Sequence, residues 1–333
     1  MLIATPNLCL DITVRTARLE LGTVARATDT DTSAGGKGVN VARAATVLGA
    51  APMLTGFLPR ADGHRFEQLL AGERTSFRPL AVDGVLRVST ILLEDDGRVT
   101  VVNGRGPEID AADWQAFLTQ LTALVPGSGV LVCSGSLPPG VPVDGYRQLA
   151  EISQRAGVPV VVDAAPQVLE QALAAQPDLV SPNLSEAEGL LLGRSDEQVH
   201  EQGTDSAVRA VRASRLLHRR GARRAVVTAG AAGAALTTAA GSWWLPAPRV
   251  NVVNPIGAGD CFAAGAALAL LAGAADPDVV RRGMAVASAS CETATAGRLD
   301  AARAAVLFER IRPEFAGAAD MSAPGTTVDG VTW

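Results

Sequence analysis

The alternation of two kinds of segment constrains the fold of this chain more than any other feature. Short runs of aliphatic residues, at 130–133, 158–163, 179–181 and 225–228, are each followed by a segment of helical character. Strands joined in this way run parallel, and the helices between them cover both faces of their sheet. The sequence therefore predicts an α/β fold with a central, mostly parallel sheet.

Two stretches depart from this alternation. Residues 10–33 and 84–105 are rich in Thr and Val, and the second contains the turn sequence Asp95-Asp96-Gly97. Such patterns are typical of antiparallel hairpins. We expect the hairpins to form a small sheet that acts as a lid over a cleft. The alternative is an extension at the edge of the main sheet.

The predicted organisation has three parts. After Pro313 the sequence loses its hydrophobic periodicity and gains small and turn-forming residues, which predicts a mobile C-terminal tail. The main α/β domain spans 1–9, 34–83 and 106–312, the β lid spans 10–33 and 84–105, and the tail spans 313–333.

Composition and charge exclude several classes of protein. Charged residues make up 19% of the 333 residues, against roughly 25% in ordinary soluble proteins, and the net charge is −5. This balance excludes disorder and argues against a nucleic-acid partner. The N-terminus lacks a signal-peptide pattern, and the apolar run 261–275 is shorter than the ~20 residues that span a bilayer. We therefore expect a cytoplasmic protein without membrane contact, in which this run is a buried helix.

The strongest local motif is NPIGAGDCFAAG at 254–265. Gly257, Ala258 and Gly259 can present backbone N–H groups at a helix N-terminus, where the helix dipole favours an anion such as a phosphoryl group. Asp260 would then lie beside that group and could accept a proton from an attacking hydroxyl. The alternative is an ordinary helix start after a tight turn.

The second motif, SAGGKGVNVAR at 33–43, contains the only lysine of the chain, Lys37, whereas the other basic residues are arginines. Lys37 lies between glycines at the start of a helix predicted over 39–48. A compact ammonium suits a narrow site for a phosphate or a sugar hydroxyl. Chance placement of a single lysine is the alternative.

The third motif is SPNLSEAE at 181–188, which directly follows a predicted strand. Asn183 and Glu186 are three residues apart at the carboxyl end of that strand, where ligands bind in parallel sheets. Their oxygens suit a Mg²⁺ ion that retains water between protein and metal. The alternative is a helix start capped by Asn183 or Ser185.

Taken together and in order, GGKGVNVAR, SGSLPPG at 134–140, PNLSE, TAGAAG at 228–233 and NPIGAGD resemble the PfkB, or ribokinase-like, family of carbohydrate kinases. The resemblance covers residues 1–312 and is strongest to the branch of 1-phosphofructokinases and tagatose-6-phosphate kinases. It implies a ribokinase-like three-layer αβα sandwich with a mostly parallel sheet and a small β-sheet lid. It also implies ATP and Mg²⁺ as cofactors, a phosphorylated ketohexose as substrate, and pairing of lids in a homodimer.

The resemblance also assigns roles to individual residues. It makes Asp260 the catalytic base and makes the anion hole from Gly257, Ala258 and Gly259. It assigns the Mg²⁺ water shell to Asn183 and Glu186, and the nucleotide site to Thr228, Gly230 and Gly233. The sugar hydroxyls would be held by Asp11, Gly35, Gly36 and Asn40, and the phosphate of the substrate by Lys37 and Arg87, with Asn103 and Ser136 lining the same cleft.

Three departures from the family pattern occur. Ser181 replaces a lysine that contacts ATP phosphates, Leu86 and Val88 replace polar neighbours of Arg87, and Pro255 precedes the IGAGD run. The resulting hypothesis is ATP-dependent phosphorylation of a ketohexose phosphate. The alternatives are a kinase of an unphosphorylated sugar or nucleoside and, because of Ser181, a catalytically weak sugar-binding sensor.

Overall fold

The central sheet is made of strands whose continuous aliphatic sequences allow burial on both faces. The computed structural model describes residues 1–192, 205–318, 327–328 and 331–332. Within these residues the sheet has eleven strands in the order β15-β14-β13-β12-β11-β10-β9-β1-β4-β5, with β6 also paired to β4. The mostly parallel sheet predicted from the sequence is confirmed.

The four strands predicted above are β9 to β12. The parallel strands are β1 (Leu2–Asn7), β4 (Met53–Pro59), β5 (Ser76–Phe77), β6 (Leu80–Val82), β9 (Leu131–Ser134), β10 (Val160–Asp163), β11 (Leu179–Val180) and β12 (Ala225–Thr228). The antiparallel strands are β13 (Gly233–Thr238), β14 (Gly241–Pro246) and β15 (Glu314–Gly317).

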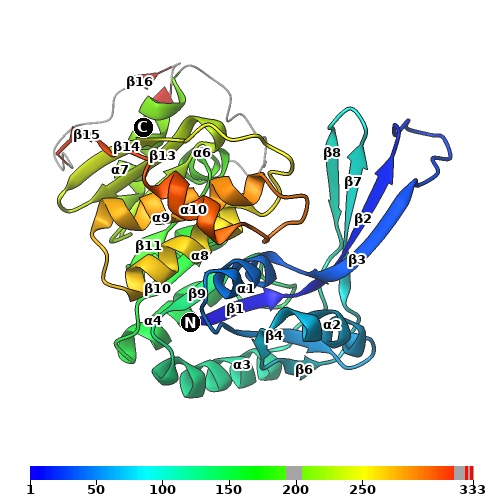
Figure 1. Cartoon of the computed structure of the whole chain (residues 1–333). Helices are drawn as coiled ribbons and strands as arrows, with labels where there is room; N and C mark the ends of the chain where they lie inside the picture. The colour runs from blue at the N-terminus through cyan, green and yellow to red at the C-terminus, as the bar shows by residue number, and fades with distance from the viewer. Residues whose placement is uncertain (193–204, 319–326, 329–330, 333) are drawn as a thin grey trace.

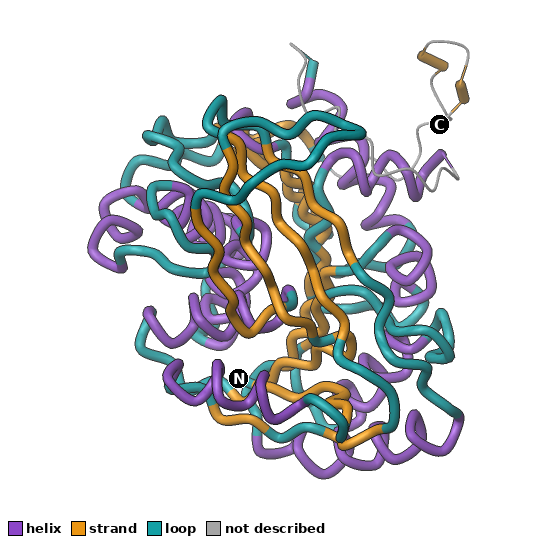
Figure 2. Tube along the Cα trace, turned by 90° about the vertical axis from the view of Figure 1, so that its right-hand side faces the viewer, coloured by secondary structure: helices purple, strands orange, loops and turns teal. Residues whose placement is uncertain are grey.

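Helices cover the two faces of this sheet, so the main body has three layers (Figures 1 and 2). Side chains alternate along each strand: Ile3 joins one apolar cluster, and its neighbours Leu2 and Ala4 join the other. The first cluster contains residues of α1 (Lys37–Val47), α2 (Gly63–Leu70), α8 (Ala258–Leu271), α9 (Asp276–Cys291) and α10 (Ala301–Phe308). The second contains residues of α3 (Ala111–Leu124), α4 (Gly145–Arg155), α5 (Pro166–Leu173), α6 (Leu184–Leu192) and α7 (Ser206–Arg219).

The apolar run after Asp260 forms the buried helix α8, as its composition predicts. Its small residues allow α8 and α9 to pack closely: a Cβ on Gly265 would lie 2.9 Å from the carbonyl oxygen of Arg282. No helix in the described ranges is both long and apolar enough to cross a membrane. The close contact with α9 holds α8 in place in the core.

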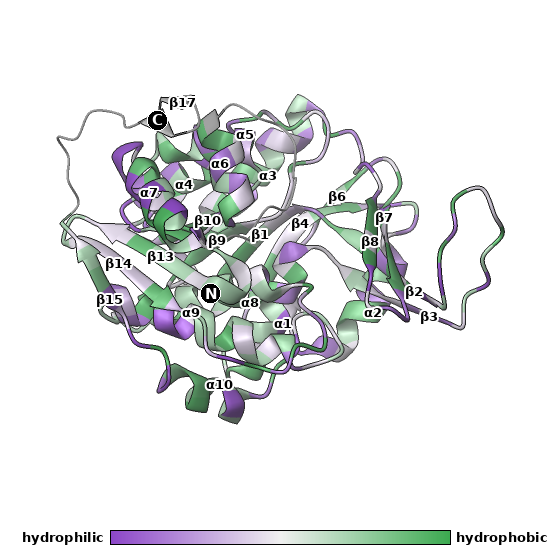
Figure 3. Cartoon of the chain, turned by 90° about the horizontal axis from the view of Figure 1, so that it is seen from above, coloured by the Kyte–Doolittle hydropathy of each residue, from purple (hydrophilic) through white to green (hydrophobic). Residues whose placement is uncertain are grey.

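The predicted hairpins form a separate four-stranded sheet that projects from the body (Figure 3). Its strands, in the order β3-β2-β7-β8, are β2 (Cys9–Thr16), β3 (Asp29–Gly35), β7 (Arg87–Glu94) and β8 (Val99–Asn103). The turn at Gly97 has φ 87°, which suits glycine. The alternative of an extension of the main sheet is wrong. Both hairpins are antiparallel, as predicted, and they join through the parallel pair of β2 and β7.

The structure places a strand at the beginning of the tail that the sequence predicts to be mobile. Residues Glu314–Gly317 form β15, which pairs antiparallel with β14 at the edge of the main sheet. Phe315 contacts Trp243 edge to face, with ring centroids 5.7 Å apart. Farther on, β16 (Thr327–Val328) pairs with β17 (Val331–Thr332), and the other tail residues lie outside the described part.

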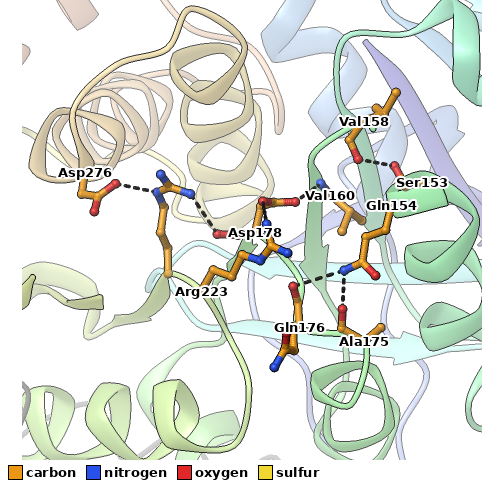
Figure 4. Close-up of polar contacts among 10 residues, drawn as sticks. Ser153, Gln154, Val158, Val160, Ala175, Gln176, Asp178, Arg223 and Asp276 are labelled. Atoms are coloured by element: carbon orange, nitrogen blue, oxygen red, sulfur yellow. Dashed lines mark hydrogen bonds and ion pairs between the residues drawn. The ribbon is translucent and has the colours of Figure 1, made fainter. Parts of the chain in front are cut away.

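Polar contacts close the amino-terminal edge of the sheet (Figure 4). The Asp178 carboxylate accepts a hydrogen bond from the Val160 amide at the start of β10 (2.9 Å). It also forms an ion pair with Arg223, which lies just before β12 (3.3 Å). Gln154 donates to the carbonyl oxygens of Ala175 and Gln176 in the same region. These bonds fix three strand ends, and the opposite, carboxyl edge is where a ligand site is expected.

Candidate active site

Most of the predicted site residues lie at the carboxyl ends of β9, β11 and β12 or at the N-termini of α1 and α8. Strand β1 pairs with β4 on one side and with β9 on the other, so the chain order reverses at β1. Ligands of open α/β sheets bind in the crevice outside such a reversal. The topology therefore directs these strand ends toward one site.

The turn before α8 has the conformation that its glycines predict. Gly257 is the N-cap residue with φ 79°, and a Cβ on Gly259 would meet no atom within 4 Å. The Ala258 amide already donates to the carbonyl oxygen of Pro255 (3.2 Å). An anion at this turn would therefore be bound by the amides of Gly257 and Gly259 and by the helix dipole, whereas the Ala258 amide shapes the turn.

Asp260 lies in the first turn of α8 and is buried, with 5% of its surface exposed. Burial raises its pKa to about 7; the positive charge of Lys37 opposes this shift, and the negative charge of Asp163 adds to it. Its Oδ2 accepts a hydrogen bond from Asn40 Nδ2 at 2.8 Å. A carboxylate that titrates near neutral pH is suited to general base catalysis.

Lys37 occupies the centre of a group of carboxylates. Its Nζ lies 3.3 Å from Asp163 Oδ2 and 3.9 Å from Glu186 Oε1. Burial lowers the pKa of the ammonium, but Asp163, Glu186 and Asp260 outweigh burial and raise it overall. The sole lysine thus stays charged between the α8 turn and the start of α6.

Asp163 was missed by the sequence analysis, although it is 4% exposed at the last position of β10 and is the nearest partner of Lys37. The rule that selected Asn183 and Glu186, a polar residue at the carboxyl end of a predicted strand, also applies to Asp163. It lacked a surrounding motif and so received no role. Its charge fixes the position of the ammonium.

Asn183 and Glu186 form a reciprocal cap at the start of α6. The Asn183 amide donates to Glu186 Oε2 (2.9 Å), and the Glu186 amide donates to Asn183 Oδ1 (2.8 Å). The alternative interpretation, a capped helix start, is therefore present in the structure. It leaves Glu186 Oε1 directed toward Lys37, so capping and ligand binding are compatible.

The predicted nucleotide residues lie next to this cap. Asn183 forms an isolated bridge with Thr228, whose amide donates to the carbonyl oxygen of Pro182 at 3.1 Å. Gly230 and Gly233 have φ of 51° and 142°, and a Cβ on Gly233 would lie 2.2 Å from the Leu245 carbonyl oxygen. The loop after β12 therefore requires glycine where the sequence has it.

The predicted sugar-binding residues meet where the small sheet joins the body. A Cβ on Gly35 would lie 2.3 Å from the Asp11 carboxyl carbon, and the Gly36 amide donates to that carboxylate. Burial raises the pKa of Asp11, while the Cys9 thiol, which donates to it at 3.2 Å, and nearby Arg43 oppose the shift. The absence of a side chain at Gly35 thus provides the space that Asp11 occupies.

Arg87 begins β7 and donates twice to the carbonyl oxygen of Asn7, at 3.0 and 3.2 Å. Asn7, which the sequence analysis also missed, donates from Nδ2 to Ser136 Oγ at 2.9 Å and so connects Arg87 to Ser136. Asn103, exposed at the end of β8, accepts from Ser89 Oγ at 2.8 Å, but no hydrogen bond joins it to the other predicted residues.

Comparisons with known proteins identify the family of the chain. Residues 4–301 match the family model described as pfkB family carbohydrate kinase. The chain is 29% identical over 307 residues to the 1-phosphofructokinase of Escherichia coli (strain K12), covering 92% of this chain and 96% of that protein. It also resembles Escherichia coli phosphofructokinase-2 in complex with potassium, with 26% identity, a TM-score of 0.82, and coverage of 93% and 98%.

A likeness in fold alone extends to Arabidopsis thaliana ribokinase complexed with ribose and ATP (22% identity, TM-score 0.71, coverage of 92% of this chain and 98% of that chain). The ribokinase-like fold expected from the sequence motifs is confirmed. The chain belongs to the pfkB family of carbohydrate kinases. It is an ATP-dependent sugar kinase.

Proposed function

We propose that the protein transfers the γ-phosphoryl group of ATP to a hydroxyl of a ketohexose phosphate, of the 1-phosphofructokinase or tagatose-6-phosphate kinase type. The observation that carries the proposal is the buried Asp260 beside both Lys37 and the glycine turn of α8. The identity to 1-phosphofructokinase over nearly the whole chain supports a phosphorylated substrate.

In the reaction, Asp260 takes the proton of the acceptor hydroxyl. The hydroxyl oxygen bonds to the γ-phosphorus, the bond from that phosphorus to the bridging oxygen of ADP breaks, and ADP leaves with the electron pair. The amides of Gly257 and Gly259 and the Lys37 ammonium stabilise charge on the transferring group. Asn40 leaves Asp260 Oδ1 available for the hydroxyl because it occupies Oδ2.

Asn183 and Glu186 are the residues that would hold Mg²⁺. Part of their oxygen capacity is used in the helix cap, and no cluster of three metal-binding side chains occurs in the described ranges. This donor set fits Mg²⁺, which commonly binds one or two carboxylates and otherwise keeps water and phosphate oxygens. Bound there, the ion would neutralise charge on the ATP phosphates.

Arg87 supports recognition of the phosphate already on the sugar. It lies at the foot of the small sheet, beside Asp11 and the Asn7–Ser136 pair. Lys37 lies closer to the acid groups of the transfer site, so we assign the substrate phosphate mainly to Arg87 and the transferring phosphoryl group mainly to Lys37. Asp11, Gly35, Gly36 and Asn40 would hold the sugar hydroxyls.

The test is a panel of fructose 1-phosphate, fructose 6-phosphate, tagatose 6-phosphate and free hexoses with ATP and Mg²⁺, assayed for ADP release. We expect turnover of at least one ketohexose phosphate and a kcat roughly 10³-fold lower for Asp260→Asn with an unchanged KM for ATP. Turnover of free sugars alone would favour the alternative kinase. Thermal stabilisation by sugars without ADP release would favour the sensor.

We also propose that the small sheet forms a lid and pairs with a second copy of the chain. Strand β8 is an edge strand, and Val99, Val101 and Val102 on it are 40%, 46% and 58% exposed. An apolar edge strand is a template for pairing with another chain. Light scattering should give a dimer, and Val101→Lys should shift it toward monomer; a monomeric wild-type protein at micromolar concentration would contradict this proposal.

A further inference from the structure

A chain of hydrogen bonds connects the candidate base to a buried ion pair. Glu73, in the short helix Ala71–Glu73, binds Arg43 through two bonds, from Nε to Oε2 (2.5 Å) and from Nη2 to Oε1 (2.6 Å). Arg43 Nη1 donates to Asn40 Oδ1 at 3.0 Å, and Asn40 Nδ2 donates to Asp260 Oδ2 at 2.8 Å. Neither Glu73 nor Arg43 has a role in the reaction proposed above.

The chemistry of this chain fixes the orientation of one side chain. A guanidinium has only donors, so the Asn40 oxygen must face Arg43. The Asn40 NH₂ group must then face Asp260, which as a carboxylate can only accept. If the amide were reversed, NH₂ would face a donor and the oxygen would face a carboxylate, and both contacts would be repulsive.

Arg43 itself is held firmly enough to impose this orientation. It is 5% exposed, and its Nη2 also donates to the carbonyl oxygen of Ala34 at 2.6 Å, near the end of lid strand β3. A Cβ on Gly297 would lie 3.1 Å from Arg43 Cδ and 3.0 Å from Asn40 Cα. The two side chains are therefore packed closely and have little room to rearrange.

We propose that Arg43, held by Glu73, is a positioning residue for phosphoryl transfer: it locks the Asn40 amide so that Asn40 donates to Asp260. The inference rests on the proposed role of Asp260 as base. The charged groups that face Asp260 are Lys37 on α1, Asp163 on β10 and Asp11 on β2. Two of these three are negative and favour protonation, so the Asn40 donor helps Lys37 to keep the base ionised.

The main test is the double variant Arg43→Met/Glu73→Gln, which removes the lock without leaving a buried unpaired charge. Because a freed Asn40 amide can turn its oxygen toward a protonated Asp260, we expect the acidic limb of the kcat–pH profile to move up by about one pH unit. At pH 7 kcat should fall roughly fivefold while the KM for ATP stays unchanged. A limb that stays in place overturns the inference.

Arg43→Lys provides a second, milder variant if the double variant does not fold. One ammonium cannot bind both Glu73 oxygens and Asn40 as a planar fork does, so the limb should move in the same direction by about half a unit. An unchanged limb in this variant also overturns the inference. Arg303→Met/Glu292→Gln is the matched control, because that pair has the same two-bond geometry between α10 and the C-terminal end of α9 and should leave the limb in place.

Two measurements separate failure of this inference from failure of the proposed function. If Asp260→Asn keeps wild-type kcat, Asp260 is not the base, and both ideas fall. If Asp260→Asn is inactive and the Arg43 variants keep the wild-type limb, only the positioning role is refuted. Denaturant unfolding of the wild type and the Arg43 variants from pH 5 to 8, each with and without Asp260→Asn, measures the shift in the pKa of Asp260 without an activity assay. This shift should agree with the shift of the acidic limb of the kcat–pH profile.

Discussion

Replacing Asp260 by Asn should stabilise the folded protein at alkaline pH while removing its activity. Burial raises the pKa of Asp260 from 3.8 to about 7, so the folded state holds a proton that the unfolded chain has already released. Ionising the carboxyl in the folded state therefore destabilises the wild-type protein as the pH rises from about 4 to 7. Asparagine has no such ionisation, and its oxygen can still accept the Asn40 bond.

The magnitude follows from the size of the shift. About three pKa units at about 1.4 kcal/mol each give a ceiling of about 4 kcal/mol in the free energy of unfolding at pH 8. Lys37 loses one neighbouring carboxylate in the variant, which lowers the gain, although Asp163 and Glu186 remain beside it. We expect a net stabilisation of about 2 to 4 kcal/mol at pH 8 that vanishes near pH 4.

The assay is urea unfolding of both proteins at several values between pH 4 and pH 8, with equal m-values as the check that the unfolding transition is the same. Asp178→Asn is the control, since it removes a carboxylate at the opposite edge of the sheet and should destabilise the protein (Figure 4). A stability difference between wild type and Asp260→Asn that does not change with pH, or that grows toward acid, would refute the reasoning.

Three further predictions concern the substrate, the nucleotide and the scaffold. Arg87→Ala should raise KM for sugar phosphates roughly 10- to 100-fold through loss of a charge-assisted contact; an equal effect on free sugars would contradict phosphate recognition. Ser181→Lys should lower KM for ATP roughly tenfold, because it restores a cation at the position where the family pattern has a lysine that contacts ATP phosphates. The buried Ser181 hydroxyl has no hydrogen-bond partner among the described residues, so the substitution breaks no hydrogen bond there. An unchanged KM would show that no phosphate lies there. Asp178→Asn should cost about 1 to 3 kcal/mol of stability, measured by urea unfolding, and leave kcat unaltered.

The parallel core was predictable because its signal is local. Runs such as Ala225–Thr228 have the composition of strands buried on both faces, and the structure places strands there. The parallel pairing of β2 with β7 was not predictable in this way, since it joins two hairpins that are far apart in the sequence. Strand β15 was missed for a related reason: it is mostly exposed, so its pairing with β14 leaves no burial pattern.

The site residues also differ in whether a local sequence signal marks them. Glycine motifs found the α8 turn and Lys37, because a tight turn or a close approach demands specific residue types. Arg43 and Glu73 had no such signal, although Arg43 is the last residue of the GGKGVNVAR motif. The role that we propose for them rests on a pairing across 30 positions that only the folded chain reveals.

The chain contains a single lysine, and this has a practical consequence. Lysine that is isotopically enriched at Nζ would place one reporter in each molecule, at the centre of the carboxylate group described above. Its single resonance would need no assignment. Titrating nucleotide, sugar or metal into such a sample, one ligand at a time, would show how the binding of each ligand changes the Lys37 resonance and so the electrostatic environment of the reacting atoms.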